Sequence, residues 1–260
     1  MNTRSRFLIL ITGHPIPEVQ NQHGGFTELY TQGLLRGEAT NNIHVDSIDL
    51  TVLCNRESLP DPILYQGILM TGSPVMLAEK EPWMALASLY VSEILDKKIP
   101  FLGVCLGHQL LGQTLGGKVG PNPQGREIGT VSVQRTGPGD AFLDRMPMAF
   151  QAQATHMDVI LELPGALEVV GTAPHDPHHM VRAGSLAWGV QFHPEFSADI
   201  IAAYLRARRP LLESEQGADA FDRKINKVEP TVAASLIFSW FRDFALDHQL
   251  SVSGQQNHDN

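Results

Sequence analysis

Short apolar runs alternate in the first half of the chain with longer segments whose apolar residues recur at helical spacing. The apolar runs predict buried strands at residues 7–11, 67–70 and 99–104, because a strand covered on both faces needs no polar alternation. The segments between them predict helices at residues 26–36 and 83–96. This alternation of strands and helices predicts an α/β fold, with a mainly parallel sheet flanked by helices.

The second half of the chain begins with short strand-like runs at close spacing, followed by helical segments. The runs are residues 131–133, 149–154, 167–172, 179–182 and 188–192. Ala183-Gly184-Ser185 predicts a hairpin turn between the last two, so we expect a small antiparallel sheet appended to the parallel one. Residues 198–246 predict helices and residues 251–260 a polar tail. No linker divides the chain, and residues 1–250 are expected to form a single domain.

Composition narrows the class of protein. The chain has 260 residues, 43% of them hydrophobic, and a formal net charge of −9, which argues against disorder and against a general nucleic-acid or anionic-membrane surface. Cys54 and Cys105 are too few for a multi-disulfide scaffold and favour a reducing compartment. The first apolar run is too short for a signal peptide, and none approaches the ~20 residues of a membrane span. We therefore expect a soluble, cytoplasmic protein.

The segment at residues 99–109 carries the most informative motif. Its apolar strand runs into Gly103-Val104-Cys105-Leu106-Gly107, and a helix is predicted from about residue 108. Gly-x-Cys-x-Gly is the spacing of a nucleophile elbow, in which small neighbours allow a tight strand-to-helix turn. The helix N-terminus favours a thiolate and a developing oxyanion. The alternative is a buried structural cysteine beside closely packed glycines.

A second motif supplies a candidate base. Residues 187–192 predict a strand that ends at His193-Pro194-Glu195. His193 and Glu195 are two residues apart, so on an extended chain they point to the same face. The carboxylate can then orient the imidazole, and the imidazole can take a proton from the cysteine. The alternative is a surface histidine and glutamate at a strand end.

Together these motifs resemble the class I, or triad, glutamine amidotransferases. The segment Gly103–Gln109 matches the family's elbow, and His193-Pro194-Glu195 matches its second motif. Thr71-Gly72-Ser73-Pro74 stands where the family has its oxyanion loop. Arg126–Gly129 and His156–Asp158 are similar to segments in the amidotransferase domain of GMP synthases and their stand-alone relatives. The resemblance covers most of the chain up to the helical C-terminal segment and implies a flavodoxin-like sheet.

The resemblance implies a three-residue mechanism. Cys105 is the nucleophile that attacks the side-chain amide carbon of glutamine and forms a γ-glutamyl thioester. His193, oriented by Glu195, protonates the departing ammonia and later activates water.

It also implies the roles of the neighbouring residues. Backbone N–H groups of Leu106 and of Gly72 or Ser73 form the oxyanion hole, and Gln109 contacts the substrate. Ser73 departs from the Gly-Gly-Pro or Gly-Pro-Gly loops of many relatives. We expect the oxyanion hole to persist, because Gly-Ser-Pro still supplies a free N–H.

Other polar groups are given structural interpretations. The cluster His175-Asp176-Pro177-His178-His179 has no distant partner at metal-ligand spacing, so we expect a solvated loop and no metal. His156 and Asp158 are expected to shape the pocket. The run Arg206–Arg209 is interpreted as a solvated helix end. The half-reaction requires no metal or nucleotide cofactor.

Three hypotheses about function remain open. The Ser-Gly-Gly-x-Asp-Ser loop of the ATP pyrophosphatase in GMP synthases is absent. The chain is therefore not expected to be a complete GMP synthase. The first hypothesis is a glutamine amidotransferase that passes ammonia to an unidentified acceptor or a separate synthase subunit. The alternative is a γ-glutamyl peptide hydrolase acting on other γ-glutamyl compounds. A cysteine-based redox sensor or regulatory protein is the third, although such a protein needs neither His193 nor Glu195. No nucleic-acid or membrane partner is expected.

Overall fold

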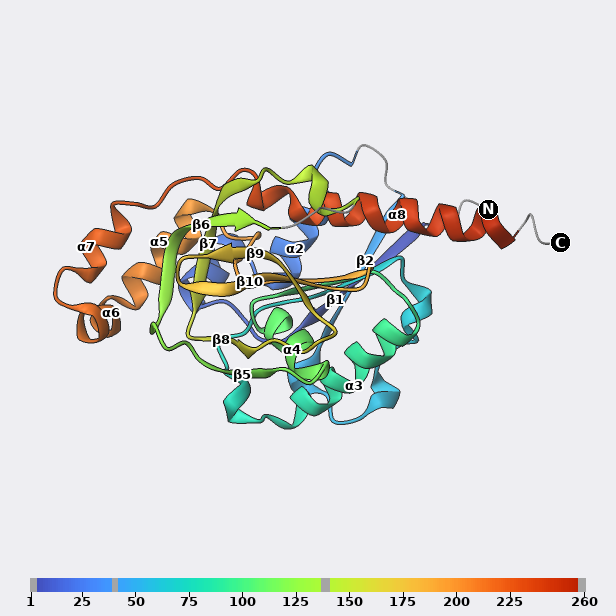
Figure 1. Cartoon of the computed structure of the whole chain (residues 1–260), viewed down its shortest axis with the longest axis horizontal. Coiled ribbons are helices and arrows are strands. Elements are labelled where there is room, and N and C mark those ends of the chain that lie inside the picture. The colour runs from blue at the N-terminus through green and yellow to red at the C-terminus, as the bar shows by residue number, and fades with distance from the viewer. Residues whose placement is uncertain (1–3, 39–41, 137–140, 257–260) are drawn as a thin grey trace.

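The computed structural model describes residues 4–38, 42–136 and 141–256, which contain a nine-stranded sheet in the order β2-β1-β3-β4-β11-β10-β9-β6-β7 (Figure 1). Five neighbouring strands are parallel: β2 (Ile43–Asp49), β1 (Ser5–Ile11), β3 (Gly67–Met70), β4 (Phe101–Val104) and β11 (Ala187–Val190). Four further strands extend the sheet in antiparallel fashion: β10 (Asp176–Ala183), β9 (Glu168–Ala173), β6 (Glu127–Arg135) and β7 (Ala149–His156). The expected fold class is confirmed.

A second, two-stranded antiparallel sheet pairs β5 (Lys118–Pro121) with β8 (Asp158–Glu162). The sequence pattern did not predict these strands. It did predict the hairpin at Gly184, which joins β10 to β11 and has a φ of +57°. Glycine adopts this left-handed conformation without the cost that a Cβ imposes.

Helices cover both faces of the large sheet (Figure 1). These layers include α2 (Phe26–Leu34) and α8 (Ile237–Gln256) on one face and α3 (Pro82–Asp96) and α4 (Leu106–Thr114) on the other. Successive β1 side chains alternate between the two cores, Phe7 and Ile9 toward α2 and α8, Leu8 and Leu10 toward α3 and α4. Burial on both faces explains the unbroken apolar run.

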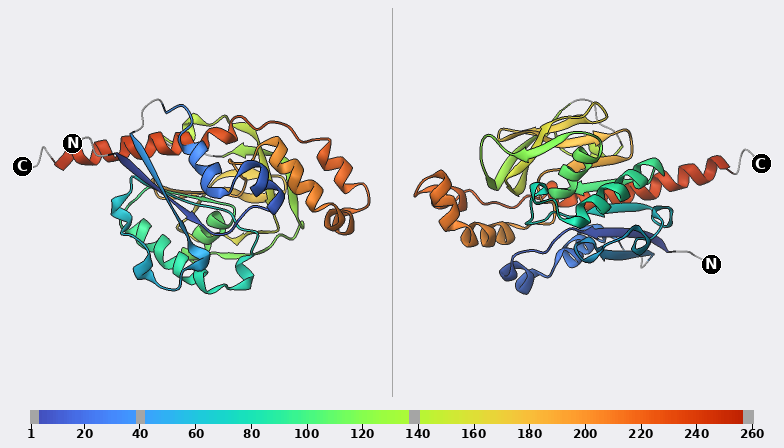
Figure 2. Two further views of the ribbon diagram at one scale, coloured as in Figure 1. Left: turned by 180° about the vertical axis from the view of Figure 1, so that it is seen from behind. Right: turned by 90° about the horizontal axis from the view of Figure 1, so that it is seen from below.

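The remaining helices are α1 (Pro17–His23), α5 (Ala198–Ala207), α6 (Arg209–Gln216) and α7 (Ala220–Ile225). Both views in Figure 2 place α5, α6 and α7 together at one end of the molecule and the last turns of α8 at the other. The sequence predicts a helix ending at Leu246, whereas α8 continues to Gln256, because the polar residues that follow can remain helical without an apolar stripe. Within the described ranges, no helix is long and apolar enough to cross a membrane.

Strand order brings three loops together. β4 lies between β3 and β11, and all three are parallel. Their carboxyl ends therefore meet at one edge of the sheet, where α/β proteins place their functional groups. The loop at Thr71 follows β3, Cys105 follows β4 and His193 follows β11.

Candidate active site

The backbone at Cys105 has the strained geometry of an elbow. Cys105 caps α4 with φ 51° and ψ −102°, a conformation that non-glycine residues rarely adopt. A Cβ on Gly103 would lie 2.4 Å from the Gly107 carbonyl oxygen, and one on Gly107 would lie 2.7 Å from the Met70 carbonyl oxygen. The two glycines thus allow strand and helix to approach closely enough to form the turn.

His193 pairs with Glu195, and both His193 and Cys105 lie close to Gly72. The His193 Nδ1 and Glu195 Oε1 atoms are 2.7 Å apart, and both side chains are almost fully buried. The imidazole stacks on Phe196, with ring centres 4.2 Å apart and planes 6° from parallel. Burial lowers the pKa of His193, but Glu195 and Cys105 outweigh burial and raise this pKa to about 10. The surroundings thus favour an imidazolium beside the sulfur.

The loop that follows β3 closes over this pair. A Cβ on Gly72 would lie 2.8 Å from His193 Cε1 and 3.2 Å from Cys105 Cβ, so only glycine fits there without displacement. The Thr12 hydroxyl donates a 2.9 Å hydrogen bond to the Gly72 carbonyl and holds the loop in place. On the opposite side, Leu106 is the first residue of α4, so its N–H has no intrahelical acceptor.

Ser73 and Gln109 have engaged side chains. The Ser73 hydroxyl accepts a 3.1 Å hydrogen bond from the Val75 N–H. The Gln109 Nε2 donates to the Asp158 carbonyl at 2.7 Å and to Gln191 Oε1 at 3.1 Å. These bonds use both amide hydrogens, which leaves Oε1 as the atom of Gln109 that can meet a substrate.

Sequence reasoning missed Tyr30 and Arg208. Burial, Glu195 and Cys105 raise the pKa of Tyr30 well above its usual range, so a neutral phenol stands beside the cysteine. Arg208 was expected in a solvated helix end, but it is half-buried, lies over the Tyr204 ring and donates to the Thr155 hydroxyl. No local pattern distinguishes these residues from ordinary helix residues.

Arg208 lies within electrostatic reach of the cysteine. Burial and Arg126 lower the pKa of the Arg208 guanidinium, whereas Tyr204 and Cys105 act in the opposite direction. Its positive charge suits Arg208 to hold an anionic group of a substrate.

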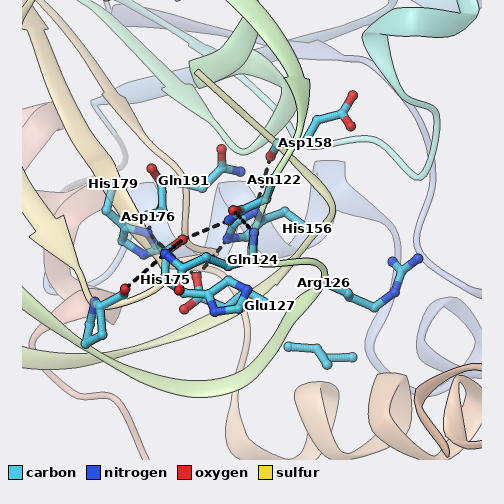
Figure 3. Close-up of polar contacts among 12 residues, drawn as sticks. Asn122, Gln124, Arg126, Glu127, His156, Asp158, His175, Asp176, His179 and Gln191 are labelled. Atoms are coloured by element: carbon cyan, nitrogen blue, oxygen red, sulfur yellow. Dashed lines mark hydrogen bonds and ion pairs between the residues drawn. The ribbon is translucent and has the colours of Figure 1, made fainter. Parts of the chain in front are cut away.

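The expectation of a solvated histidine loop is wrong for His179. His175 and His178 are half-buried and contact the carbonyls of Gly125 and Ile160. His179 is fully buried, because this segment begins β10 rather than forming a loop. Figure 3 shows His179 directed toward His156 and Glu127, two residues contributed by neighbouring strands of the sheet.

This geometry defines a site suited to nucleophilic acyl transfer, with a cysteine at a strand-to-helix elbow beside a histidine that a carboxylate orients. The family model described as glutamine amidotransferase class-I matches residues 24–206. The chain belongs to this family of amidotransferases and amide hydrolases, and the resemblance seen in the motifs is confirmed.

The relatives of this chain are named for different activities. Gamma-glutamyl peptidase 5 of Arabidopsis thaliana is 24% identical over 237 residues, covering 88% of this chain and 92% of that protein. The glutamine-hydrolysing GMP synthase subunit of Methanococcus vannielii is 33% identical over 144 residues, covering 55% of this chain and 71% of that protein. The solved structure of a glutamine amidotransferase from Thermotoga maritima superposes with a TM-score of 0.68 at 23% identity, covering 93% and 98% of the two chains, which shows the shared fold.

Proposed function

We propose that this protein hydrolyses the side-chain amide of glutamine through a γ-glutamyl thioester on Cys105 and passes the ammonia to an acceptor or a partner synthase. The observation that carries the proposal is the buried 2.7 Å contact between His193 and Glu195, with the Cys105 thiol on the other side of the imidazole. This arrangement supplies a nucleophile, an acid–base group and its orienting carboxylate in one place.

The reaction begins with the thiolate of Cys105 opposite the imidazolium of His193. The sulfur attacks the amide carbon and the carbonyl oxygen becomes an oxyanion. The C–N bond then breaks as His193 donates its proton to the leaving nitrogen, which departs as ammonia. The neutral imidazole next takes a proton from water, the hydroxide displaces the sulfur from the thioester, and glutamate leaves with the thiolate–imidazolium pair restored.

The oxyanion needs donors that are already in place. We assign this role to the backbone N–H of Leu106 and to that of Gly72 or Ser73, which flank the cysteine on opposite sides. Losing one such donor costs about 10²–10³ in rate in comparable enzymes. The carbonyl of Gly72 already accepts the Thr12 hydroxyl, and this bond fixes the orientation of the adjoining peptide before substrate arrives.

A γ-glutamyl peptide is the second candidate substrate. It reacts by the same thioester, but its leaving group is an amino acid whose carboxylate is absent from ammonia. Arg208 favours this candidate, because its half-buried guanidinium lies within electrostatic reach of Cys105. The peptidase relative also matches a larger share of this chain than the Methanococcus vannielii GMP synthase protein does.

The test is to measure glutamate release by the purified chain from glutamine and from a γ-glutamyl dipeptide, with Cys105→Ala as the control. Cysteine-dependent release that favours glutamine supports the amidotransferase, and a weak rate directs the search to its activating synthase. Cysteine-dependent release from the dipeptide with little from glutamine supports the autonomous hydrolase instead. Equal release by Cys105→Ala contradicts both. If the folded chain releases no glutamate from either substrate, the result favours an enzyme that needs a partner subunit or the redox-sensor hypothesis.

A further inference from the structure

Three strands of the large sheet, β6, β7 and β10, bring two imidazoles and a carboxylate together. Glu127 comes from β6, His156 from β7 and His179 from β10, and their exposed fractions are 6%, 4% and 0%. One ligand atom of each lies within 4.8 Å of those of the other two, and Figure 3 shows the three side chains converging. Among the described residues, this is the one group of such side chains close enough to share an ion.

The contact between His156 and Glu127 requires a proton or a cation between the two atoms. His156 Nδ1 lies 3.2 Å from the Asp158 carbonyl oxygen, which can only accept, so Nδ1 carries a hydrogen. In a neutral ring this leaves the lone pair of Nε2 directed at Glu127 Oε2, 2.8 Å away. Two acceptors at that distance repel each other. Either a proton or a metal ion must stand between them.

The surroundings of His179 favour the metal ion over the proton. It is fully buried, and neither of its ring nitrogens has a hydrogen-bond partner. Its Nδ1 lies 3.8 Å from Glu127 Oε2 and 3.7 Å from Asp176 Oδ2, beyond hydrogen-bonding distance of both. A proton on His156 satisfies only the Glu127 contact and leaves His179 unsatisfied, at the cost of a buried polar group without a partner. A metal ion links all three side chains.

We propose that Glu127, His156 and His179 bind one divalent cation of the zinc class. Two imidazoles and one carboxylate are a donor set that zinc prefers. Zinc bonds of about 2.0–2.1 Å at tetrahedral angles separate neighbouring ligand atoms by roughly 3.3 Å, and the two measured separations from Glu127 Oε2, 2.8 and 3.8 Å, lie on either side of this value.

The surroundings of the cluster supply a supporting contact for His156 and a second buried carboxylate beside His179. The Asp158 carbonyl orients His156, and the buried carboxylate of Asp176 lies beside His179. With neutral imidazoles, Glu127 and Asp176 carry two negative charges, which a divalent cation neutralises. The same Asp158 carbonyl also accepts from Gln109 at 2.7 Å, so the ion would steady a wall of the candidate active site.

Access to the cluster comes from the Glu127 side. Glu127 lines a surface pocket of about 480 Å³ together with His175, Arg126 and Lys224. The basic side chains at this pocket repel a hydrated cation, so we expect slow loading and long equilibration times.

The experiment uses the full-length chain carrying Cys54→Ser and Cys105→Ser, because either thiol can bind zinc by itself. This protein is treated with a chelator, equilibrated with zinc chloride, separated from free metal by gel filtration and analysed for zinc. We expect about one zinc per chain. Adding His179→Gln or Glu127→Gln should weaken zinc binding at least tenfold. The matched control is His178→Gln, the adjacent histidine whose Nδ1 contacts the Ile160 carbonyl, and it should retain zinc.

A spectroscopic measurement keeps the test decisive if the ligand variants fail to fold. Cobalt chloride added to the folded thiol-free chain should give the visible absorption of tetrahedral cobalt with nitrogen and oxygen ligands. Absence of zinc and of this absorption overturns the proposal and leaves the cluster as an imidazolium–carboxylate network. Equal zinc retention in folded His179→Gln and Glu127→Gln also overturns it. Neither result bears on glutamate release, since the assay lacks Cys105.

Discussion

His193 and His179 are both buried histidines with carboxylates nearby, yet their surroundings differ. His193 meets Glu195 at 2.7 Å and stacks on Phe196. The His179 ring stacks on Phe192, but its Nδ1 lies 3.7–3.8 Å from two carboxylates, and neither ring nitrogen has a hydrogen-bond partner among the described residues. His193 is therefore held in one orientation, as the proposed proton transfer requires, whereas we propose that His179 binds a metal ion.

The difference arises from how each group is assembled. Glu195 is two residues from His193, so the extended chain itself brings them together. The partners of His179 come from other strands, with Glu127 on β6 and His156 on β7. The geometry of a local pair is determined by one segment of the chain, whereas the geometry of a cluster across three strands depends on the register of the sheet. Changes to each group should therefore have different consequences.

The largest effect should follow from removing the sulfur that faces His193. Cys105→Ala should lower glutamate release by more than about 10⁴-fold, because no other group can form the thioester. Glutamate release is measured with the unchanged fold checked by circular dichroism. The matched control is Cys54→Ala at the exposed free thiol, which should retain activity. A loss at Cys54 equal to that at Cys105 contradicts the assignment.

A change at Glu195 makes His193 more like His179 by removing its charged partner. Glu195→Gln keeps the shape but not the charge, and kcat should fall by about 10²–10⁴, by analogy with the orienting carboxylate of serine proteases. The alkaline limb of the pH–rate profile should also move to lower pH, because Glu195 helps to raise the pKa of His193. An unchanged profile with full activity would show that His193 needs no orienting carboxylate.

Arg208 provides a positive charge that acts on Cys105, the residue beside His193. Arg208→Gln should raise KM for a γ-glutamyl dipeptide by about 10–100-fold, the cost of one charged hydrogen bond, and change KM for glutamine much less. Steady-state kinetics on both substrates measure this split, with the exposed Arg206→Gln as the matched control. Equal effects on the two substrates contradict a role for Arg208 in selecting the peptide.

The smallest effect concerns stability. The pKa of His193 is raised to about 10 in the fold, against ~6.5 in an unfolded chain. Its protonation therefore stabilises the fold fully below about pH 6.5, and this contribution declines with rising pH and is lost above about pH 10. Urea unfolding should show wild type exceeding His193→Gln in free energy of unfolding by a few kcal/mol at pH 6, and by less at pH 9. A difference independent of pH contradicts the raised pKa.

The sequence predicted what depends on short-range pattern. The apolar runs predicted β1, β3 and β4, because a strand buried on both faces has an uninterrupted run of apolar residues. The glycines around Cys105 and the spacing of His193 and Glu195 did the same for the candidate site, because steric requirements at a turn and side-chain direction on a strand are local.

What the sequence could not predict depends on contacts between distant segments. The fold places the side chains of Tyr30 and Arg208 where Cys105 affects their pKa values, and nothing near them in sequence indicates this. His179 was grouped with its neighbours His175 and His178, but strand register turns it inward toward β6 and β7. Edge strands such as β8 were missed because a short apolar run gives no sign of its partner.

The central claim, that Cys105 carries a γ-glutamyl thioester, is tested most directly by mass spectrometry. The protein is mixed with glutamine or a γ-glutamyl dipeptide, quenched in acid during turnover, and its intact mass and peptide map are recorded. The account predicts a mass increase of one γ-glutamyl group, confined to the peptide that contains Cys105 and absent from Cys105→Ala. Turnover without such an adduct in a quench fast enough to capture it, or an adduct on another residue, would contradict the account.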